Sequence, residues 1–133
     1  MLLNKFKAWD EELNKVYSGE DIEQQSNLDA RLSYGELAIF RIDDDGNYTE
    51  LEPLQYIGMT DKNHIEIYEG HIVSTGSSEL MVIVYDEKQC TFKACPISDY
   101  IINAGNGGYT GYKVPSYSVV VGNIYENPEY LKL

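Results

Sequence analysis

A chain of 133 residues with 43% hydrophobic content can bury one core and is too short for two well-buried domains. Its formal net charge of −12 is uneven, because residues 1–70 hold 16 acidic and 6 basic side chains while residues 71–133 hold 6 and 4. Nucleic-acid backbones are bound by clustered Lys and Arg, so this balance argues against direct nucleic-acid binding. It leaves open a basic protein partner, mimicry of nucleic-acid charge, or acidity that serves only solubility.

The chain shows no targeting or membrane signal. No run approaches the roughly 18 to 20 apolar residues that span a bilayer, and the first residues lack the layout of a signal peptide. We therefore expect a soluble, cytoplasmic protein. Cys90 and Cys95 lie in one extended stretch at a spacing that points their side chains to opposite faces, so they cannot pair with each other. We interpret both as small buried thiols.

The first 30 residues allow two interpretations. Apolar side chains between residues 5 and 17 recur at helical spacing. The same stretch also fits a hairpin, with extended arms on either side of the charged residues 10–12. Residues 18–30 are polar and poor in β-branched side chains, so we expect a mobile connection there.

Strands are expected from residue 37 onward. Residues 37–42 and 48–51 flank an acidic turn with a glycine, which predicts a hairpin. The turn does not fit an EF-hand calcium loop, because the sixth and twelfth positions counted from Asp43 are Tyr48 and Leu54 instead of Gly and Glu.

The middle of the chain is predicted to continue as short strands. A new strand begins at Gln55, and a turn at residues 61–64 leads into a half-buried strand that ends at Gly70. Residues 80–85 are a continuous apolar run typical of a central strand. This strand is expected to pair with residues 90–96 across a turn.

Helical turns and a loop are expected near the C-terminus. Residues 98–103 fit one helical turn capped by Ser98, and the glycine-rich residues 105–112 fit a loop. A last strand covers residues 118–122, after which Asn127 caps a final turn with Pro128 at its first position. Many short strands joined by tight turns predict a small barrel or sandwich.

Three blocks of the sequence resemble one known family. Residues 5–10, 54–73 and 119–129 have the order of turn and apolar residues that is similar to the YopX-like family of small phage and prophage proteins. The resemblance implies a mainly β fold within one domain, a small SH3-type barrel at residues 54–133 with an N-terminal β-rich extension at residues 1–53, and short helical turns. It also favours the hairpin at residues 5–17 and the cytoplasm of a bacterial host. It implies no established activity.

The residues that carry this resemblance have roles that we interpret as structural. Glycines supply positive φ or close backbone approach, tyrosines pack half-buried, and the aspartate accepts hydrogen bonds in a turn. These structural signature residues are Trp9, Tyr56, Gly58, Asp61, Tyr68, Gly70, Gly122, Asn127 and Pro128.

Two histidines depart from the family pattern. His64 and His71 stand where the family has Gly and Asp, and His64 would need a left-handed or adjusted backbone. With Glu66 and Glu69 they form the one histidine-carboxylate cluster of the sequence, although zinc needs three or four converging ligands. We interpret both histidines as exposed structural positions. We expect no metal, no cofactor and no catalytic residue, and hence no enzyme.

The tyrosines near the glycine loop are the candidate binding residues. Tyr109, Tyr112 and Tyr117 stand among Gly, Ser and Asn, a composition typical of binding loops, although the alternative that they pack back onto the barrel stays open. Our first hypothesis is a non-enzymatic accessory protein that binds a host or phage protein through this loop and its acidic face. The alternatives are an acidic nucleic-acid mimic that occupies a DNA-binding protein and a metal-dependent enzyme. Homo-oligomerisation stays open.

Overall fold

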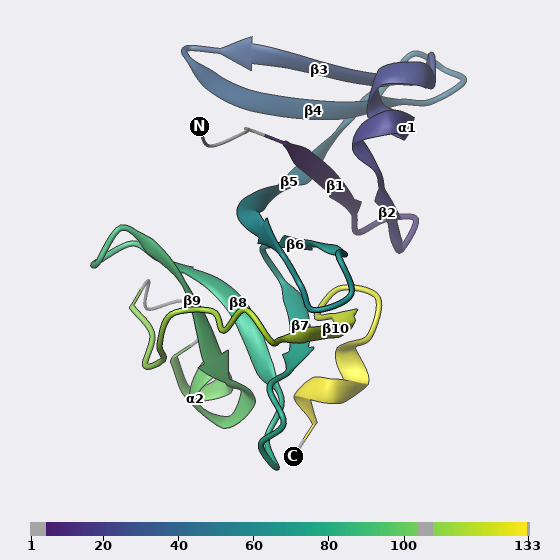
Figure 1. The fold of residues 1–133 in the computed structure, drawn as a ribbon. Coiled ribbons are helices and arrows are strands. Elements are labelled where there is room, and N and C mark those ends of the chain that lie inside the picture. Colours follow the sequence, from purple (N-terminus) through teal and green to yellow (C-terminus); the bar gives the residue numbers. More distant parts are fainter. Residues whose placement is uncertain (1–4, 104–107, 133) are drawn as a thin grey trace. The chain divides into compact units, whose positions relative to one another are not determined.

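The computed structural model describes residues 5–103 and 108–132, and strands predominate in them (Figure 1). These residues divide into two compact units, an N-terminal unit up to Gln55 and a C-terminal unit from Tyr56. In chain order the elements are β1 (Phe6–Asp10), β2 (Lys15–Tyr17), α1 (Gly19–Gln24), β3 (Leu28–Ser33), β4 (Glu36–Ile42), β5 (Tyr48–Thr60), β6 (Glu66–Tyr68), β7 (His71–Ser74), β8 (Met81–Asp86), β9 (Thr91–Pro96), α2 (Ile97–Asn103), β10 (Val119–Asn123) and the 3₁₀ helix η1 (Pro128–Leu131).

The expectation of a mainly β fold is confirmed, but that of an SH3-type barrel is not. Two sheets form, with strand orders β2-β1-β5-β4-β3 and β10-β7-β8-β9. The end strands of the second sheet, β10 and β9, do not pair with each other, so the described residues contain no closed barrel. Alternating side chains specify strands but not which edges meet, and this is why the sequence could not exclude an open sheet.

The N-terminal unit begins with the hairpin of β1 and β2, which confirms the extended interpretation over the helix. Trp9 pairs with Val16 in this hairpin, and Asn14 in the turn has a φ of 54°. Asn tolerates this left-handed conformation better than most residues. The unit's core contains Tyr17 and Ile39, both almost fully buried.

The expected mobile connection at residues 18–30 is wrong, because it contains α1 and the start of β3. Ser18 caps the helix: its Oγ accepts a hydrogen bond from the Asp21 amide at 3.0 Å, and the Ser18 amide donates to the Asp21 carboxylate at 3.1 Å. This reciprocal pair is a capping box, and Ile22 adds an apolar contact with the core. The sequence Ser-x-x-Asp was the signal that could have revealed the helix.

Strand β5 is longer than expected because it changes partners along its length. It pairs with β4 at residues 48–51, with β1 at residues 52–55 and with β6 from Tyr56 onward. The separate strand expected from Gln55 is therefore a continuation of one long strand. Gly58, with a φ of 96°, lies where the β5–β6 register shifts between Tyr56 and Thr60, so this signature glycine marks a bulge.

The C-terminal unit is built around β8. This strand lies between β7 and β9, as the apolar run predicted, and successive residues from Met81 to Val84 are buried. Ile83 belongs to one apolar cluster and Val82 to another, because alternate side chains of a strand point to opposite faces. Ile97 of α2 and Leu131 of η1 belong to the second cluster. The predicted helical turn at residues 98–103 is confirmed as α2. The predicted cap is wrong, because Ser98 lies inside the helix and its amide and hydroxyl both donate to the Glu79 carboxylate.

The two cysteines differ in their environment. Cys95 is buried in β9, and its burial raises the pKa of the thiol to about 11. Cys90 is exposed in the turn before β9, where its φ is 53°, so the expectation of a second buried thiol is wrong. Both are free thiols. Among the described helices, none has the length and apolar character needed to cross a membrane.

Candidate binding surface and the residues that support it

The signature aspartate holds two distant parts of the C-terminal unit together. One Asp61 carboxylate oxygen accepts hydrogen bonds from the amides of Asn63 and Ile65, at 2.8 and 2.9 Å, and the other accepts one from the Val120 amide at 2.9 Å. The Val120 amide is the largest cause of the lowered pKa of Asp61, which burial opposes. All these bonds are to backbone groups, so Asp61 joins the turn after β5 to strand β10.

The histidines occupy different environments. His64 is exposed and has a φ of 65°, the left-handed conformation expected for a residue replacing glycine. His71 is buried, which corrects the expectation of an exposed position. Its Nδ1 accepts a hydrogen bond from the Tyr68 amide at 3.1 Å, and its ring meets the Tyr68 ring edge-on at 5.9 Å. Nowhere in residues 5–103 and 108–132 do three or more His, Cys, Asp or Glu side chains gather as metal ligands would.

Two signature glycines make room for the C-terminal segment. Gly70 has a φ of 88°, and a Cβ there would collide with the Tyr125 ring. Its carbonyl accepts a hydrogen bond from the Ile124 amide at 2.9 Å, so the close approach is also a backbone contact. A Cβ on Gly122 would lie 2.6 Å from the Asn127 side-chain oxygen.

The remaining signature residues lie at turns and in the sheets. Asn127 precedes η1 with Pro128 in its first turn, but its side chain does not cap the helix as expected. Its side-chain oxygen instead accepts a hydrogen bond from the Asn123 amide at 3.1 Å. The rings of Tyr56 and Tyr68 lie 5.6 Å apart on the paired strands β5 and β6. Each of these residues contributes to local structure.

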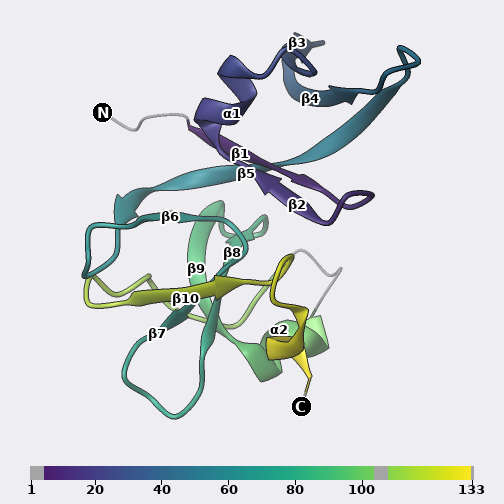
Figure 2. The same cartoon turned by 90° about the vertical axis from the view of Figure 1, so that its right-hand side faces the viewer.

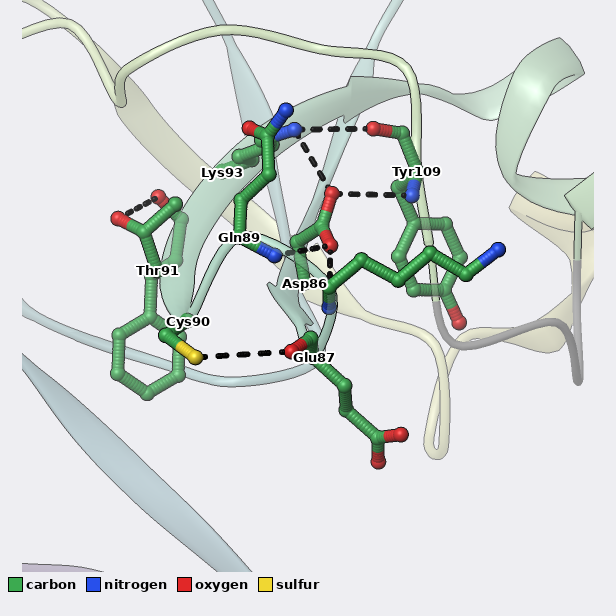
Figure 3. A network of polar contacts seen from close by, with 9 residues as sticks. Asp86, Glu87, Gln89, Cys90, Thr91, Lys93 and Tyr109 are labelled. Atoms are coloured by element: carbon green, nitrogen blue, oxygen red, sulfur yellow. Dashed lines mark hydrogen bonds and ion pairs between the residues drawn. The ribbon is translucent and has the colours of Figure 1, made fainter.

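A buried ion pair lies at the end of the β8–β9 hairpin, and the sequence analysis missed it (Figure 3). The Lys93 ammonium donates to the Asp86 carboxylate at 2.7 Å. The same carboxylate accepts hydrogen bonds from the amides of Lys88, Gln89 and Tyr109, at 2.9, 3.1 and 3.2 Å. The hydrogen bond from Lys93, followed by that from the Tyr109 amide, lowers the pKa of Asp86 to about 2.

This network fixes Tyr109, the first of the three candidate binding tyrosines. Lys93 also donates to the Tyr109 carbonyl at 3.1 Å, so both backbone groups of Tyr109 are held by one ion pair (Figure 3). The Tyr109 ring is partly buried and stacks on the Tyr100 ring at 5.8 Å. Tyr109 therefore packs back onto its own unit. Residues 105–107 of the predicted glycine loop lie outside the described residues.

The segment after Tyr109 is held to strand β9. Tyr112 forms an isolated bridge with Ala94, with hydrogen bonds of 2.9 and 3.2 Å in the two directions. Gly111, with a φ of 152°, lies so close to the Ala94 carbonyl that a Cβ would collide with it. Val114 is buried, and both the amide and the hydroxyl of Ser118 donate to the Pro115 carbonyl. The backbone from residue 111 to residue 118 is thus fixed at several points.

The side chains of the other two candidate tyrosines remain exposed on this fixed segment. Tyr112 is 47% exposed and Tyr117 is 61% exposed. They border a groove of about 530 Å³. The groove is lined by Met59, Tyr112, Lys113, Val114, Pro115, Ser116 and Tyr117. Met59 comes from the end of β5, and no sequence pattern connected it with the tyrosines.

Comparison with known proteins places the chain in a family. The family described as YopX protein matches residues 5–132. The chain belongs to the YopX family. Among solved structures, protein EF1440 from Enterococcus faecalis is similar, with 22% sequence identity, a TM-score of 0.53, and coverage of 99% of this chain and 100% of that one. At this identity the likeness shows a shared fold. No curated protein matches the chain.

Proposed function

We propose that this YopX protein is a non-enzymatic phage or prophage accessory protein that binds a host or phage protein. The contact surface is the groove formed by Met59 and residues 112–117. The observation that supports this most is the contrast between a backbone held by β9 and two exposed tyrosines on it.

This contrast favours binding for an energetic reason. A loop that is already ordered loses little conformational entropy when a partner associates with it. Tyrosine offers a large amphipathic contact area with few rotatable bonds, and it is enriched among residues that dominate protein interfaces. Exposed Tyr112 and Tyr117 meet both conditions, whereas Tyr109 is already engaged with Tyr100.

The test is affinity capture from cells that carry the phage or prophage, with quantitative mass spectrometry of the recovered proteins. The variant is Tyr112→Ser with Tyr117→Ser, and the matched control is Tyr34→Ser, since Tyr34 is a fully exposed tyrosine in the other unit. We expect the paired variant to reduce recovery of the specific partner by about tenfold or more, as for two interface anchors. Recovery equal to that of the wild type and the control would refute this assignment.

A second candidate function is supported by the charge of the N-terminal unit. Residues 5–55 hold 13 acidic and 5 basic side chains, and the three aspartates after β4 are exposed. Such a surface suits a protein that normally binds DNA. Capture of that partner would then fall steeply as salt is added, because the contact is electrostatic. The first function would be favoured if capture does not change with salt and if the variant Tyr112→Ser with Tyr117→Ser recovers less of the partner.

A further inference from the structure

Strand β3 is one border of the N-terminal sheet, and its edge differs from the two edges of the C-terminal sheet (Figures 1 and 2). Among the described residues no strand pairs with its outer side, and residues 30–33 are exposed. The edge of β10 is covered, because Val120 donates to Asp61 and the Lys62 amide donates to the Ser118 carbonyl. The edge of β9 carries the bridge to Tyr112. An edge that is uncovered from Ala30 to Ser33 is a template for pairing with another chain.

The hydrogen-bond pattern shows which groups face outward. The Ile42 amide donates to the Asn27 carbonyl at 2.7 Å, and the β3–β4 register continues from there as Leu28 with Arg41 and Asp29 with Phe40. In an antiparallel ladder, hydrogen-bonded pairs alternate with non-hydrogen-bonded pairs. Residues 27, 29 and 31 therefore bond to β4, and the amides and carbonyls of Ala30 and Leu32 point away from it.

The sequence of this edge is self-complementary. Residues 28–32 are Leu-Asp-Ala-Arg-Leu. When this segment is read backwards, the apolar residues stay at the same positions, and Asp and Arg change places. We propose that the protein dimerises through antiparallel pairing of β3 with β3 of a second copy, with the two-fold axis at Ala30. This proposal is independent of the binding role given to Tyr112 and Tyr117.

The two-fold arrangement satisfies three features of the strand at once. The outward backbone groups of Ala30 in the two copies bond to each other. Asp29 of each copy lies directly opposite Arg31 of the other, in a non-hydrogen-bonded pair where side chains are closest. Leu32, 74% exposed, lies on the same face as the buried Leu28 of the other copy and extends that apolar surface.

The charged groups of Asp29 and Arg31 are exposed enough to pair with those of a second copy. They form an ion pair at 2.6 Å within β3, with side chains 40% and 48% exposed. The Arg31 guanidinium also lies over the rings of Phe40 and Tyr48, at 5.0 and 5.5 Å, which holds it on this face of the sheet. The net charge of each copy opposes association, but salt screens charges separated by more than about 8 Å at physiological ionic strength.

The test is sedimentation velocity of the full chain over a concentration series. We expect the wild type to dimerise, and Asp29→Arg and Arg31→Asp each to weaken dimerisation by about tenfold or more, because each places like charges opposite each other twice. A mixture of the two single variants should form heterodimers, since one copy then presents two acids and the other two bases. Glu87→Arg, an exposed change of the same charge in the other unit, should leave dimerisation unchanged.

Three results would overturn the proposal: a wild type that stays monomeric at every concentration, single variants that dimerise as the wild type does, or a mixture that fails to associate. Circular dichroism of each variant checks that the fold is kept. If a single variant does not fold, the double variant Asp29→Arg with Arg31→Asp decides the matter, because the exchange restores complementarity and must restore dimerisation.

Discussion

Two stretches of the C-terminal unit use backbone and side chains in opposite ways. Between Asp61 and Gly70, the signature residues stabilise the fold. The Asp61 carboxylate accepts hydrogen bonds from three amides, and the Tyr125 ring occupies the space that a side chain at Gly70 would need. Between Tyr112 and Tyr117 the backbone is fixed while the tyrosine side chains are exposed. Residues that define the family are therefore not the residues to test for binding.

The largest effect on stability is expected in the variant Asp86→Ala, because Asp86 belongs to the ion pair that holds the Tyr109 backbone. It leaves the Lys93 ammonium buried without its carboxylate and releases the Tyr109 amide, so we expect the unfolding midpoint to fall by about 10 °C or more. Differential scanning fluorimetry measures the shift. Lys88→Ala is the control, because only the backbone amide of Lys88 binds Asp86, and it should change the midpoint little.

The same carboxylate predicts a dependence on pH. The folded-state pKa of Asp86 is lowered from 3.8 to about 2, so its contribution to stability is present above pH 3.8 and is lost as the pH falls toward 2. The difference in unfolding midpoint between the wild type and Asp86→Asn should therefore shrink over this range. If the difference in unfolding midpoint between the wild type and Asp86→Asn stays constant from pH 5 to about pH 2, the ion pair between Asp86 and Lys93 is contradicted.

The next effect is expected at Gly70. Ala at this position combines a strained φ with a collision against the Tyr125 ring, and we expect the free energy of unfolding to fall by about 2 to 4 kcal/mol. Gly76 is a matched control with a φ of 86° and no neighbouring atoms near its Cβ position. Gly76→Ala should cost only the conformational part, about 1 kcal/mol. Equal losses in urea unfolding would mean that Tyr125 does not occupy the space.

A smaller effect is expected for Asp61→Asn, since one side-chain oxygen remains to accept hydrogen bonds. The turn and strand β10 can no longer both be held, so we expect the unfolding midpoint to fall by about 4 °C. Hydrogen exchange should show faster exchange of the Val120 amide. Unchanged protection of the Val120 amide would mean that Asp61 does not stabilise β10, and it would contradict the assignment of Asp61 as a structural residue.

The smallest effect on stability is expected in the paired variant Tyr112→Ser with Tyr117→Ser. Exposed side chains contribute little to folding, so the unfolding midpoint should change by less than about 2 °C. A large loss of stability would place these tyrosines with the structural residues and would remove the comparison between the two stretches.

The sequence predicted the strands better than their assembly. The apolar run of β8 and the β4–β5 hairpin follow from alternation and turn chemistry, which are local properties. The barrel did not follow, because closure depends on pairing between distant edges such as β9 and β10. Helix α1 was missed because it is only six residues long, and its one clear signal is the capping box.

The candidate site was predicted in part for a similar reason. Composition identified Tyr112 and Tyr117, but it could not separate them from Tyr109, whose backbone is held by Asp86 and Lys93. Asp86 is one of 22 acidic residues, and nothing in sequence alone distinguishes a buried carboxylate from an exposed one. Lys93 within the strand predicted at residues 90–96 was the available signal, since a lysine that is buried needs a partner.

Hydrogen exchange of the captured complex tests the central claim most directly. With the partner bound, we expect new protection of backbone amides in residues 112–117 and at Met59, and little change in residues 61–70. Protection confined to other parts of the chain, or no partner recovered at all, would contradict the proposal that the exposed tyrosines form a protein-binding surface.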